Sequence, residues 1–276
     1  IIGGFRMSGK LNKDWRIGVM DMQTAGAKEK GLPSQNFAVL ALQRKVFARS
    51  NIGVFMINKQ SPGFFKDTLP GKQVNTYNRN IGLEYNLASS NNKWTGKLLG
   101  IKSFTPGLQG KDWVNAGNIL YNAKRLSFGW QHEYVGSNYN AEVGYVPRKG
   151  YIKENATAGI LFFPKKGRVL SHGIRMSSTY FFSENGKQLD NESFIPYTIT
   201  FRNFSTFTTW LATDYVKLYQ PFDPTNSGKD TLARGTEHRW KAFGTEYFSA
   251  PQKLFTFSFS TRYGGYYENG TRLNLS

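Results

Sequence analysis

The stretch that decides the fold class is Tyr77–Leu87, which reads YNRNIGLEYNL. Alternate positions hold two different kinds of side chain. One set is Tyr77, Arg79, Ile81, Leu83, Tyr85 and Leu87, and the other is Asn78, Asn80, Gly82, Glu84 and Asn86. Because consecutive side chains of a β-strand point to opposite faces, this pattern predicts a strand with one mainly apolar face and one polar face.

The same alternation recurs in Leu126–Val135 and in Leu254–Tyr263. In both stretches aromatic and aliphatic side chains alternate with Gly, Ser, Thr or charged residues. Strands of soluble sandwiches are usually about five or six residues long. These stretches are closer to the length of roughly ten residues that a tilted strand needs to cross a bilayer. The pattern therefore favours a transmembrane β-barrel over a soluble sandwich.

The connections between the predicted strands support the same class. Short turns are predicted at Asn12–Lys13, Arg49–Asn51, Ser90–Asn92, Asn122–Lys124, Pro164–Gly167, Asn203–Ser205 and Ala250–Gln252. Longer polar connections are predicted at Gly26–Gln35, Ser61–Asn75, Thr105–Lys111, Gly136–Tyr151, Glu184–Asn191, Pro221–Glu237 and Gly264–Gly270. Short and long connections alternate regularly along the chain, which is typical of periplasmic turns and extracellular loops in an up-and-down barrel.

Counting between these breaks gives about fourteen strands and the start of another at Arg272–Ser276. Bacterial single-chain barrels have even strand numbers and no open edge in lipid. We therefore expect an antiparallel outer-membrane barrel of about 14–16 strands with strands missing at one or both ends. No linker or repeat suggests a second domain, so residues 1–276 are interpreted as one partial barrel domain.

Composition limits the function classes. The 276 residues include 22 Phe, 15 Tyr and 29 Gly, which suits strands and tight turns, and no Cys, which excludes disulfides and thiolate metal sites. The net charge of +18 is interpreted first as solvated charge on the loops and in the lumen. The alternative is an anionic partner, either lipopolysaccharide phosphates or an acidic solute. Nucleic acid is not favoured, because the basic residues are scattered without a nucleic-acid motif.

Aromatic residues near the predicted strand ends suggest interfacial girdles. These candidates are Trp15, Trp94, Trp113, Tyr134, Trp240 and Tyr263. Charged residues at predicted inward positions are candidates for the lumen: Glu84, Glu133, Arg175, Arg202, Asp214, Glu246 and Arg262. Such charges either hold a lumen together or select a solute, and a glycosidase carboxylate pair is a third, weaker interpretation.

Catalysis has little support. His132 and His172 fall on predicted outward faces, and Ser178 lies about 20 Å from His172 along an extended strand. No catalytic residue, metal site or cofactor is therefore predicted, and an enzyme is disfavoured without being excluded. Asp67-Thr68-Leu69 and Asp230-Thr231-Leu232 resemble the tripeptide that Bacteroidota use for O-glycosylation, so Thr68 and Thr231 are candidate modification sites.

Several motifs together resemble one family. They include Gly3–Lys10, Trp15–Gly18, Leu32–Phe37 with Arg44–Val46, Ser50–Gly53, Tyr77–Arg79, Thr105–Gly107 and, most specifically, Asn140–Arg148. The chain resembles the Bacteroidota outer-membrane barrel domain of unknown function that commonly follows a family-nine carbohydrate-binding-like domain. The similarity covers roughly residues 1–163 well and the remainder by pattern. The resemblance implies an integral protein of a Gram-negative outer membrane and transfers no catalytic residue.

Within the last motif, Pro147 should end or bend a strand. Glu142, Pro147 and Arg148 are therefore predicted to form a latch that holds a loop over the barrel mouth, or alternatively a ligand contact.

Three functions remain open. The first is a pore or uptake component for an envelope solute, such as an anionic compound or a glycan fragment. The second is a structural barrel that partners other outer-membrane proteins. The third is a carbohydrate-active or hydrolytic enzyme. The sequence identifies neither the solute nor the partners, and it does not show whether the lumen is open.

Overall fold

The structure is a computed structural model that describes the whole chain except residues 28, 30, 62–74 and 229–230. The described residues form fifteen β-strands and no α-helix, and they include no helix that is long and apolar enough to span a membrane. The strands range from 6 to 15 residues in length. The all-β prediction is confirmed.

The strands in chain order are β1 (Gly3–Lys10), β2 (Trp15–Thr24), β3 (Gln35–Val46), β4 (Ser50–Gln60), β5 (Tyr77–Ala88), β6 (Trp94–Phe104), β7 (Trp113–Asn122), β8 (Leu126–Val135), β9 (Tyr151–Phe162), β10 (Val169–Ser183), β11 (Gln188–Phe201), β12 (Thr206–Lys217), β13 (Glu237–Phe248), β14 (Ser258–Tyr266) and β15 (Gly270–Leu275).

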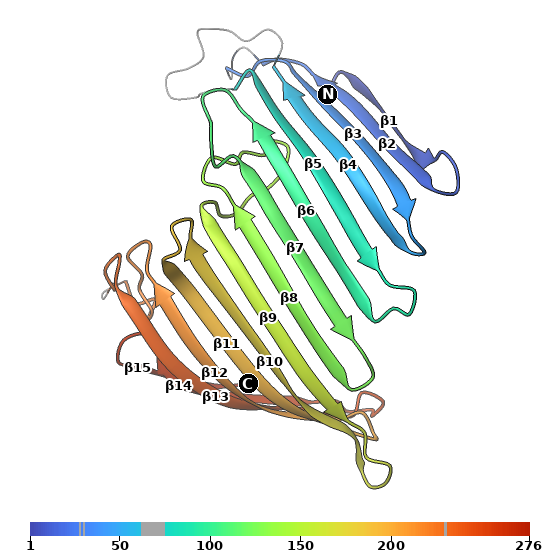
Figure 1. The fold of residues 1–276 in the computed structure, drawn as a ribbon. Coiled ribbons are helices and arrows are strands. Elements are labelled where there is room, and N and C mark those ends of the chain that lie inside the picture. Colours follow the sequence, from blue (N-terminus) through green and yellow to red (C-terminus); the bar gives the residue numbers. More distant parts are fainter. Residues whose placement is uncertain (28, 30, 62–74, 229–230) are drawn as a thin grey trace. The chain divides into compact units, whose positions relative to one another are not determined.

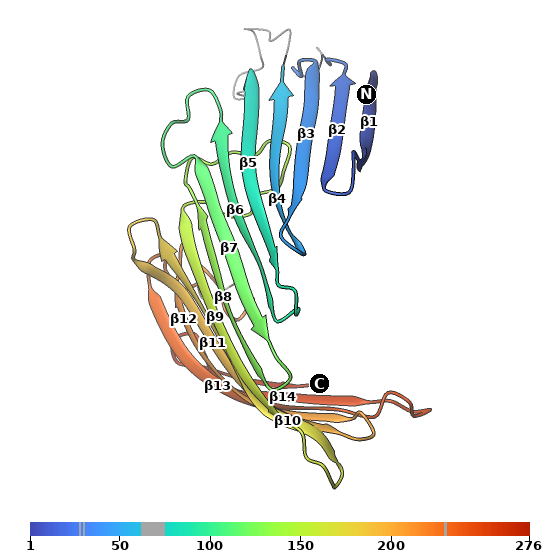
Figure 2. The same ribbon diagram turned by 45° about the vertical axis from the view of Figure 1, so that its right-hand side comes forward.

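Each strand is hydrogen bonded to the strands that precede and follow it, in the order β1 to β15 (Figures 1 and 2). Neighbouring strands run antiparallel, so the predicted up-and-down order is confirmed. The sheet is not closed: β1 and β15 are its edge strands.

The chain divides into two compact units. Unit 1 comprises residues 1–119 and 132–151, and unit 2 comprises residues 120–131 and 152–276. All three boundaries fall inside strands, in β7, β8 and β9, and not in a linker.

Unit 1 has one apolar face and one polar face. On the apolar face, strand register places exposed side chains directly opposite one another, as in the row Leu40, Met56 and Ile81. On the polar face, Asn78 and Ser103 are the largest fully buried side chains of the described chain. Polar groups are thus buried while aliphatic groups are exposed, which reverses the distribution of a water-soluble domain.

Unit 2 has the same two kinds of face. Register places Leu211, Phe243, Tyr263 and Leu273 in one row across β12 to β15, and these side chains are 50–61% exposed. The opposite face carries polar and charged side chains, including the Thr198–Thr208 hydroxyl pair at 3.0 Å.

Strand boundaries are close to the predictions in some places and different in others. Strand β8 has the predicted bounds, and β5 differs from its prediction by one residue. The stretch that was predicted to begin at Leu254 becomes a strand only at Ser258. Residues 249–257 form the connection before it, in which the Lys253 N–H donates to the Ala250 carbonyl at 3.2 Å and turns the backbone.

The predicted alternation of short and long connections is wrong at three places. Residues 184–187 and 267–269 form short connections where long ones were predicted, and residues 249–257 form a longer one where a short turn was predicted. At the first of these, β10 and β11 continue as an extended hairpin that closes at Gly186, whose φ of 75° suits glycine.

Candidate functional site

The most developed site in the structure is a buried polar cluster on the polar face of unit 1. We define the polar cluster as Lys59, Asn75, Asn78, Asn80, Ser103, Asn140 and Glu142. Register places Lys59 opposite Asn78 and Asn80 opposite Ser103, so strands β4, β5 and β6 bring these side chains to one face. The sequence spacing of two between Asn78 and Asn80 keeps both on that face.

The loop between β8 and β9, residues 136–150, supplies the other half of the cluster, and we call it the latch loop. The Glu142 carboxylate forms a 2.5 Å ion pair with Lys59 Nζ, and the two side chains are only 18% and 11% exposed. The same carboxylate accepts hydrogen bonds from Asn75 and, at 3.1 Å, from Asn140. One glutamate therefore joins the latch loop to β4 and to the residues that precede β5.

Asn78 binds the backbone of the latch loop directly. Its amide nitrogen donates to the Asn140 carbonyl at 3.0 Å and to Thr105 Oγ1 at 2.8 Å. Its amide oxygen accepts from the Glu142 N–H at 3.1 Å and from Asn80 at 2.9 Å. Because Asn78 is fully buried, losing these partners would leave unsatisfied polar groups.

The base of the latch loop is anchored to the connection between β6 and β7. The Gly136 N–H donates to the Trp113 carbonyl at 3.0 Å, and the Asn138 N–H donates to the Lys111 carbonyl at 2.9 Å. The Asn138 side chain donates to the carbonyls of Gln109 and Gly110. Gly136 is required at this approach, since a Cβ there would lie 2.0 Å from the Lys111 oxygen.

The electrostatics of the cluster favour an ionised Glu142. Burial by itself raises the pKa of this carboxyl group. Hydrogen bonds from Lys59, Asn75 and Asn140, together with the Lys59 charge, outweigh that effect and hold the pKa below its ordinary value.

The predicted latch residues have different roles in the structure. Glu142 makes the contacts described above. Arg148 lies with its guanidinium carbon 5.5 Å from the centre of the Tyr151 ring, and Tyr151 donates at 2.6 Å to Glu133. Pro147 is exposed and lies outside the strands.

The other predicted lumen charge of unit 1 is also engaged. Glu84 forms a 2.7 Å ion pair with Lys97, and Asn86 donates to it at 3.3 Å. Neither Glu84 nor Glu133 contacts another of the predicted lumen charges through these bonds.

In unit 2, Asp214, Glu246 and Arg262 share one face according to the strand register. Asp214 lies opposite Glu192 and interacts electrostatically with Glu192 and Arg262. Arg262 also donates to the Gly265 carbonyl at 3.0 Å. Arg175 is exposed on β10.

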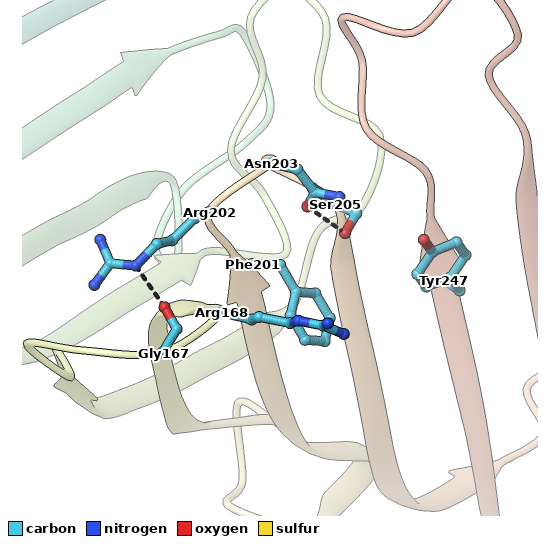
Figure 3. A pocket seen from close by; sticks show the side chains of 7 residues that line it. All are labelled: Gly167, Arg168, Phe201, Arg202, Asn203, Ser205 and Tyr247. Atoms are coloured by element: carbon cyan, nitrogen blue, oxygen red, sulfur yellow. Dashed lines mark hydrogen bonds between the residues drawn. The ribbon is translucent and has the colours of Figure 1, made fainter.

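Arg202 lies in the turn after β11 and not in a strand. Its guanidinium donates to the carbonyls of Gly167, Pro164 and Lys165 at 2.8–3.2 Å, which ties this turn to the turn between β9 and β10. Figure 3 shows that the Arg202 side chain turns to Gly167, while Tyr247 lies on the other side of a pocket of about 570 Å³. Because three carbonyls accept hydrogen bonds from its guanidinium, Arg202 holds the β9–β10 turn and the β11–β12 turn together.

The predicted girdle aromatics occupy several settings. In unit 1, Trp15 and Trp94 begin β2 and β6, Trp113 begins β7, and Tyr134 lies 5.1 Å from Trp113. In unit 2, Tyr263 packs at 5.7 Å from Phe243 in the exposed apolar row. Trp240 lies opposite Asp214 and packs 4.8 Å from Tyr267, so it belongs to the charged face.

His172 and Thr231 both lie in unit 2. His172 stacks on Phe162 at 5.3 Å, and its Nδ1 is 2.7 Å from the Tyr197 hydroxyl. Thr231 is exposed in the connection between β12 and β13. Thr68 lies outside the described residues.

Lys59, Asn75 and Ser103 were not predicted from the sequence as site residues. The sequence signals for the cluster were the alternation in Tyr77–Leu87, which places Asn78 and Asn80 on a polar face, and the prediction of Glu142 as a latch residue. Lys59 and Glu142 are 83 positions apart, and no local pattern connects them.

The chain has no match among protein-family models, curated proteins or solved structures.

Proposed function

We propose that this chain forms the wall of an outer-membrane β-barrel that acts as a pore, and that the latch loop narrows its lumen. The observation that carries the proposal is the reversed distribution of side chains. In unit 1, Asn78 is fully buried and Lys59 is 9% exposed, whereas Leu83 is 55% exposed.

This distribution suits lipid better than water. Exposed aliphatic and aromatic side chains cost about 25 cal/mol per Å² in water and nothing comparable against acyl chains. Antiparallel strands of 8 to 15 residues over β1 to β14 also have lengths that suit a tilted bilayer crossing. The edges of β1 and β15 must then be paired in the membrane, since lipid cannot satisfy their backbone groups.

The latch loop supports a pore with a restricted lumen. It binds the polar face of β4 to β6 through an ion pair and buried amide hydrogen bonds. If that face lines the lumen, the loop occupies part of the cross-section. The net charge of +18 favours an anionic solute, such as an acidic glycan fragment. The family resemblance of the sequence supports the outer membrane of a Bacteroidota-type bacterium as the location.

A structural barrel that partners other outer-membrane proteins is the second candidate. The same latch loop favours it, because a well-bonded loop can fill a lumen permanently. An outer-membrane enzyme is the third candidate. The Thr236 hydroxyl lies 2.8 Å from His238 Nε2, but a hydroxyl–imidazole pair alone does not identify a nucleophile and its base.

Single-channel conductance in planar bilayers distinguishes the first two candidates. We expect the purified protein to give discrete current steps, and Glu142→Gln to raise the conductance or the open fraction because it removes the ion pair with Lys59. Glu268→Gln, in the exposed turn after β14, removes the same charge away from the latch and should leave the currents unchanged. If wild type and Glu142→Gln both insert but carry no current, the pore is rejected and the structural barrel is favoured.

A further inference from the structure

A second site lies in unit 1, at the end of the strands where short turns join β1 to β2 and β3 to β4. It is a pocket of about 340 Å³ between the β1–β2 turn, the β3–β4 turn and the strands that they join. Five cationic side chains line it, with a single carboxylate: Lys10, Lys13, Arg16, Lys45 and Arg49, and Asp14.

Strand register forces the positive charges together. Lys10 on β1 lies directly opposite Arg16 on β2, and Arg16 lies opposite Gln43 on β3. Lys45 is two residues beyond Gln43 and therefore shares its face. Like charges directly opposite each other in an antiparallel pair are destabilising. The fold thus holds a repulsive row that a bound anion would neutralise.

The floor of the pocket is fixed by neutral hydrogen bonds. Asn51 Oδ1 accepts from Gln43 and from Asn86, both at 2.8 Å. Ser50 is 2% exposed, and its hydroxyl accepts from the Ala88 N–H at 3.1 Å. These hydrogen bonds occupy the side chains of Gln43, Ser50 and Asn51. The cationic side chains are exposed and can contact a ligand.

The walls are held by backbone contacts. The Lys45 N–H donates to the Asp14 carbonyl at 2.7 Å, which joins the β1–β2 turn to β3. The Asn12 side chain accepts from the N–H groups of Asp14 and Trp15, which fixes the turn itself. The backbone positions of the cationic residues are therefore set before any ligand binds.

Asp14 is the single carboxylate that lines the pocket with these five cations. Within the described part of the chain, no carboxylate forms an ion pair with Lys10, Arg16 or Lys45, and Arg49 donates to the neutral side chain of Asn92. Glu84, the acidic residue farther along the same row, is paired with Lys97. With five cations and one carboxylate, the pocket carries a net charge of +4 of the chain's +18.

We propose that this pocket binds a multivalent anion of the phosphate type. Several converging cationic groups neutralise a multiply charged group better than a single carboxylate, and the Arg16 guanidinium can bind two oxygens of a phosphate at once. The phosphate belongs either to a diffusible compound or to a lipid headgroup, and both present the same chemistry to the pocket. The site stands on unit 1 alone and is independent of whether the protein conducts ions.

Calorimetric titration of the full-length protein in a phosphate-free, uncharged detergent tests this site. Inorganic pyrophosphate is the first probe and short-chain phosphatidic acid the second. We expect saturable binding that weakens as salt rises, and at least about tenfold weaker binding to the variant Arg16→Gln/Lys45→Gln, the effect of losing about 1.4 kcal/mol. Tighter binding of pyrophosphate assigns a diffusible ligand, and tighter binding of phosphatidic acid assigns a lipid; either ranking supports the site.

The matched control is Lys187→Gln/Arg234→Gln, which removes two exposed positive charges from unit 2. This control should change the affinity less than twofold, and circular dichroism should show that both variants keep the strand content of wild type. The inference is overturned if neither probe binds saturably to wild type, or if the control variant loses as much affinity as the pocket variant.

Discussion

At the scale of single residues, the ion pair between Lys59 and Glu142 is the contact that matters most for the latch loop. Its side chains are mostly buried, so each needs the other as a partner. We predict that Glu142→Gln lowers the free energy of unfolding by about 1–3 kcal/mol, because a buried ammonium group loses its charged acceptor. Urea unfolding in lipid vesicles measures this loss. Glu268→Gln is the control, and an equal effect of both variants would contradict the assignment.

The same pair predicts a pH response. Because the folded pKa of Glu142 is lowered, its stabilising contribution is fully present above the ordinary value of 4.5 and is lost as the pH falls through the folded pKa. The latch loop should therefore become more mobile in acid. The chain has no cysteine, so a spin label on Tyr145→Cys, whose native side chain is 88% exposed, reports this motion. In the Glu142→Gln background the acid-induced change should disappear; its persistence would assign the motion to another group.

The sequence indicated the latch only in part. Pro147 and its neighbours predicted a loop over a barrel mouth; the structure shows that Glu142 binds the latch loop to β4. Its partner Lys59 could not be predicted, because register and loop path bring together residues that are far apart in sequence. Arg202 was predicted at an inward strand position from the alternation. In the structure it lies in the turn after β11 and donates to the Gly167 carbonyl.

At the scale of strands, close packing across β4 and β5 depends on a missing side chain. The Phe55 ring lies over Gly82, where an added Cβ would come within 2.2 Å of the ring. We predict that Gly82→Ala destabilises the protein by about 1–3 kcal/mol through overpacking. Gly100→Ala on β6 is the matched control, because nothing lies within 4 Å of its Cβ position. Thermal unfolding of both variants should separate them, and equal melting temperatures would contradict the packing argument.

Strands with sustained alternation were predictable, and connections were less so. The bounds of β5 and β8 follow from side-chain period alone. Strand β14 begins later than its apolar pattern suggests, because Leu254 and Phe255 belong to the connection that follows Pro251. The Phe257 N–H donates to the Ser249 side chain at 2.8 Å, so this part of the apolar stretch is hydrogen bonded within the connection.

At the scale of the whole molecule, we propose that one face of the sheet contacts lipid, because it carries rows of exposed apolar side chains. Leu211 lies in such a row and is 60% exposed. We predict that Leu211→Arg lowers the stability of the membrane-inserted protein by about 2–4 kcal/mol, because a charge would face acyl chains. Ser260→Arg, on the charged face of β14, should cost much less. Folding titrations in vesicles compare the two, and equal costs would argue against a lipid-facing row.

The most direct test of the proposed membrane wall is the environment of four positions on the two faces of β5. The variants carry one spin-labelled cysteine each, in place of Asn80, Ile81, Leu83 or Glu84, and are reconstituted into lipid. The label reports collisions with lipid-soluble oxygen and with a water-soluble nickel complex. We predict oxygen access at Ile81 and Leu83, which are exposed on the apolar face, and low oxygen access at Asn80 and Glu84. Access of the nickel complex to Ile81 and Leu83, without this alternation, would contradict a lipid-facing wall.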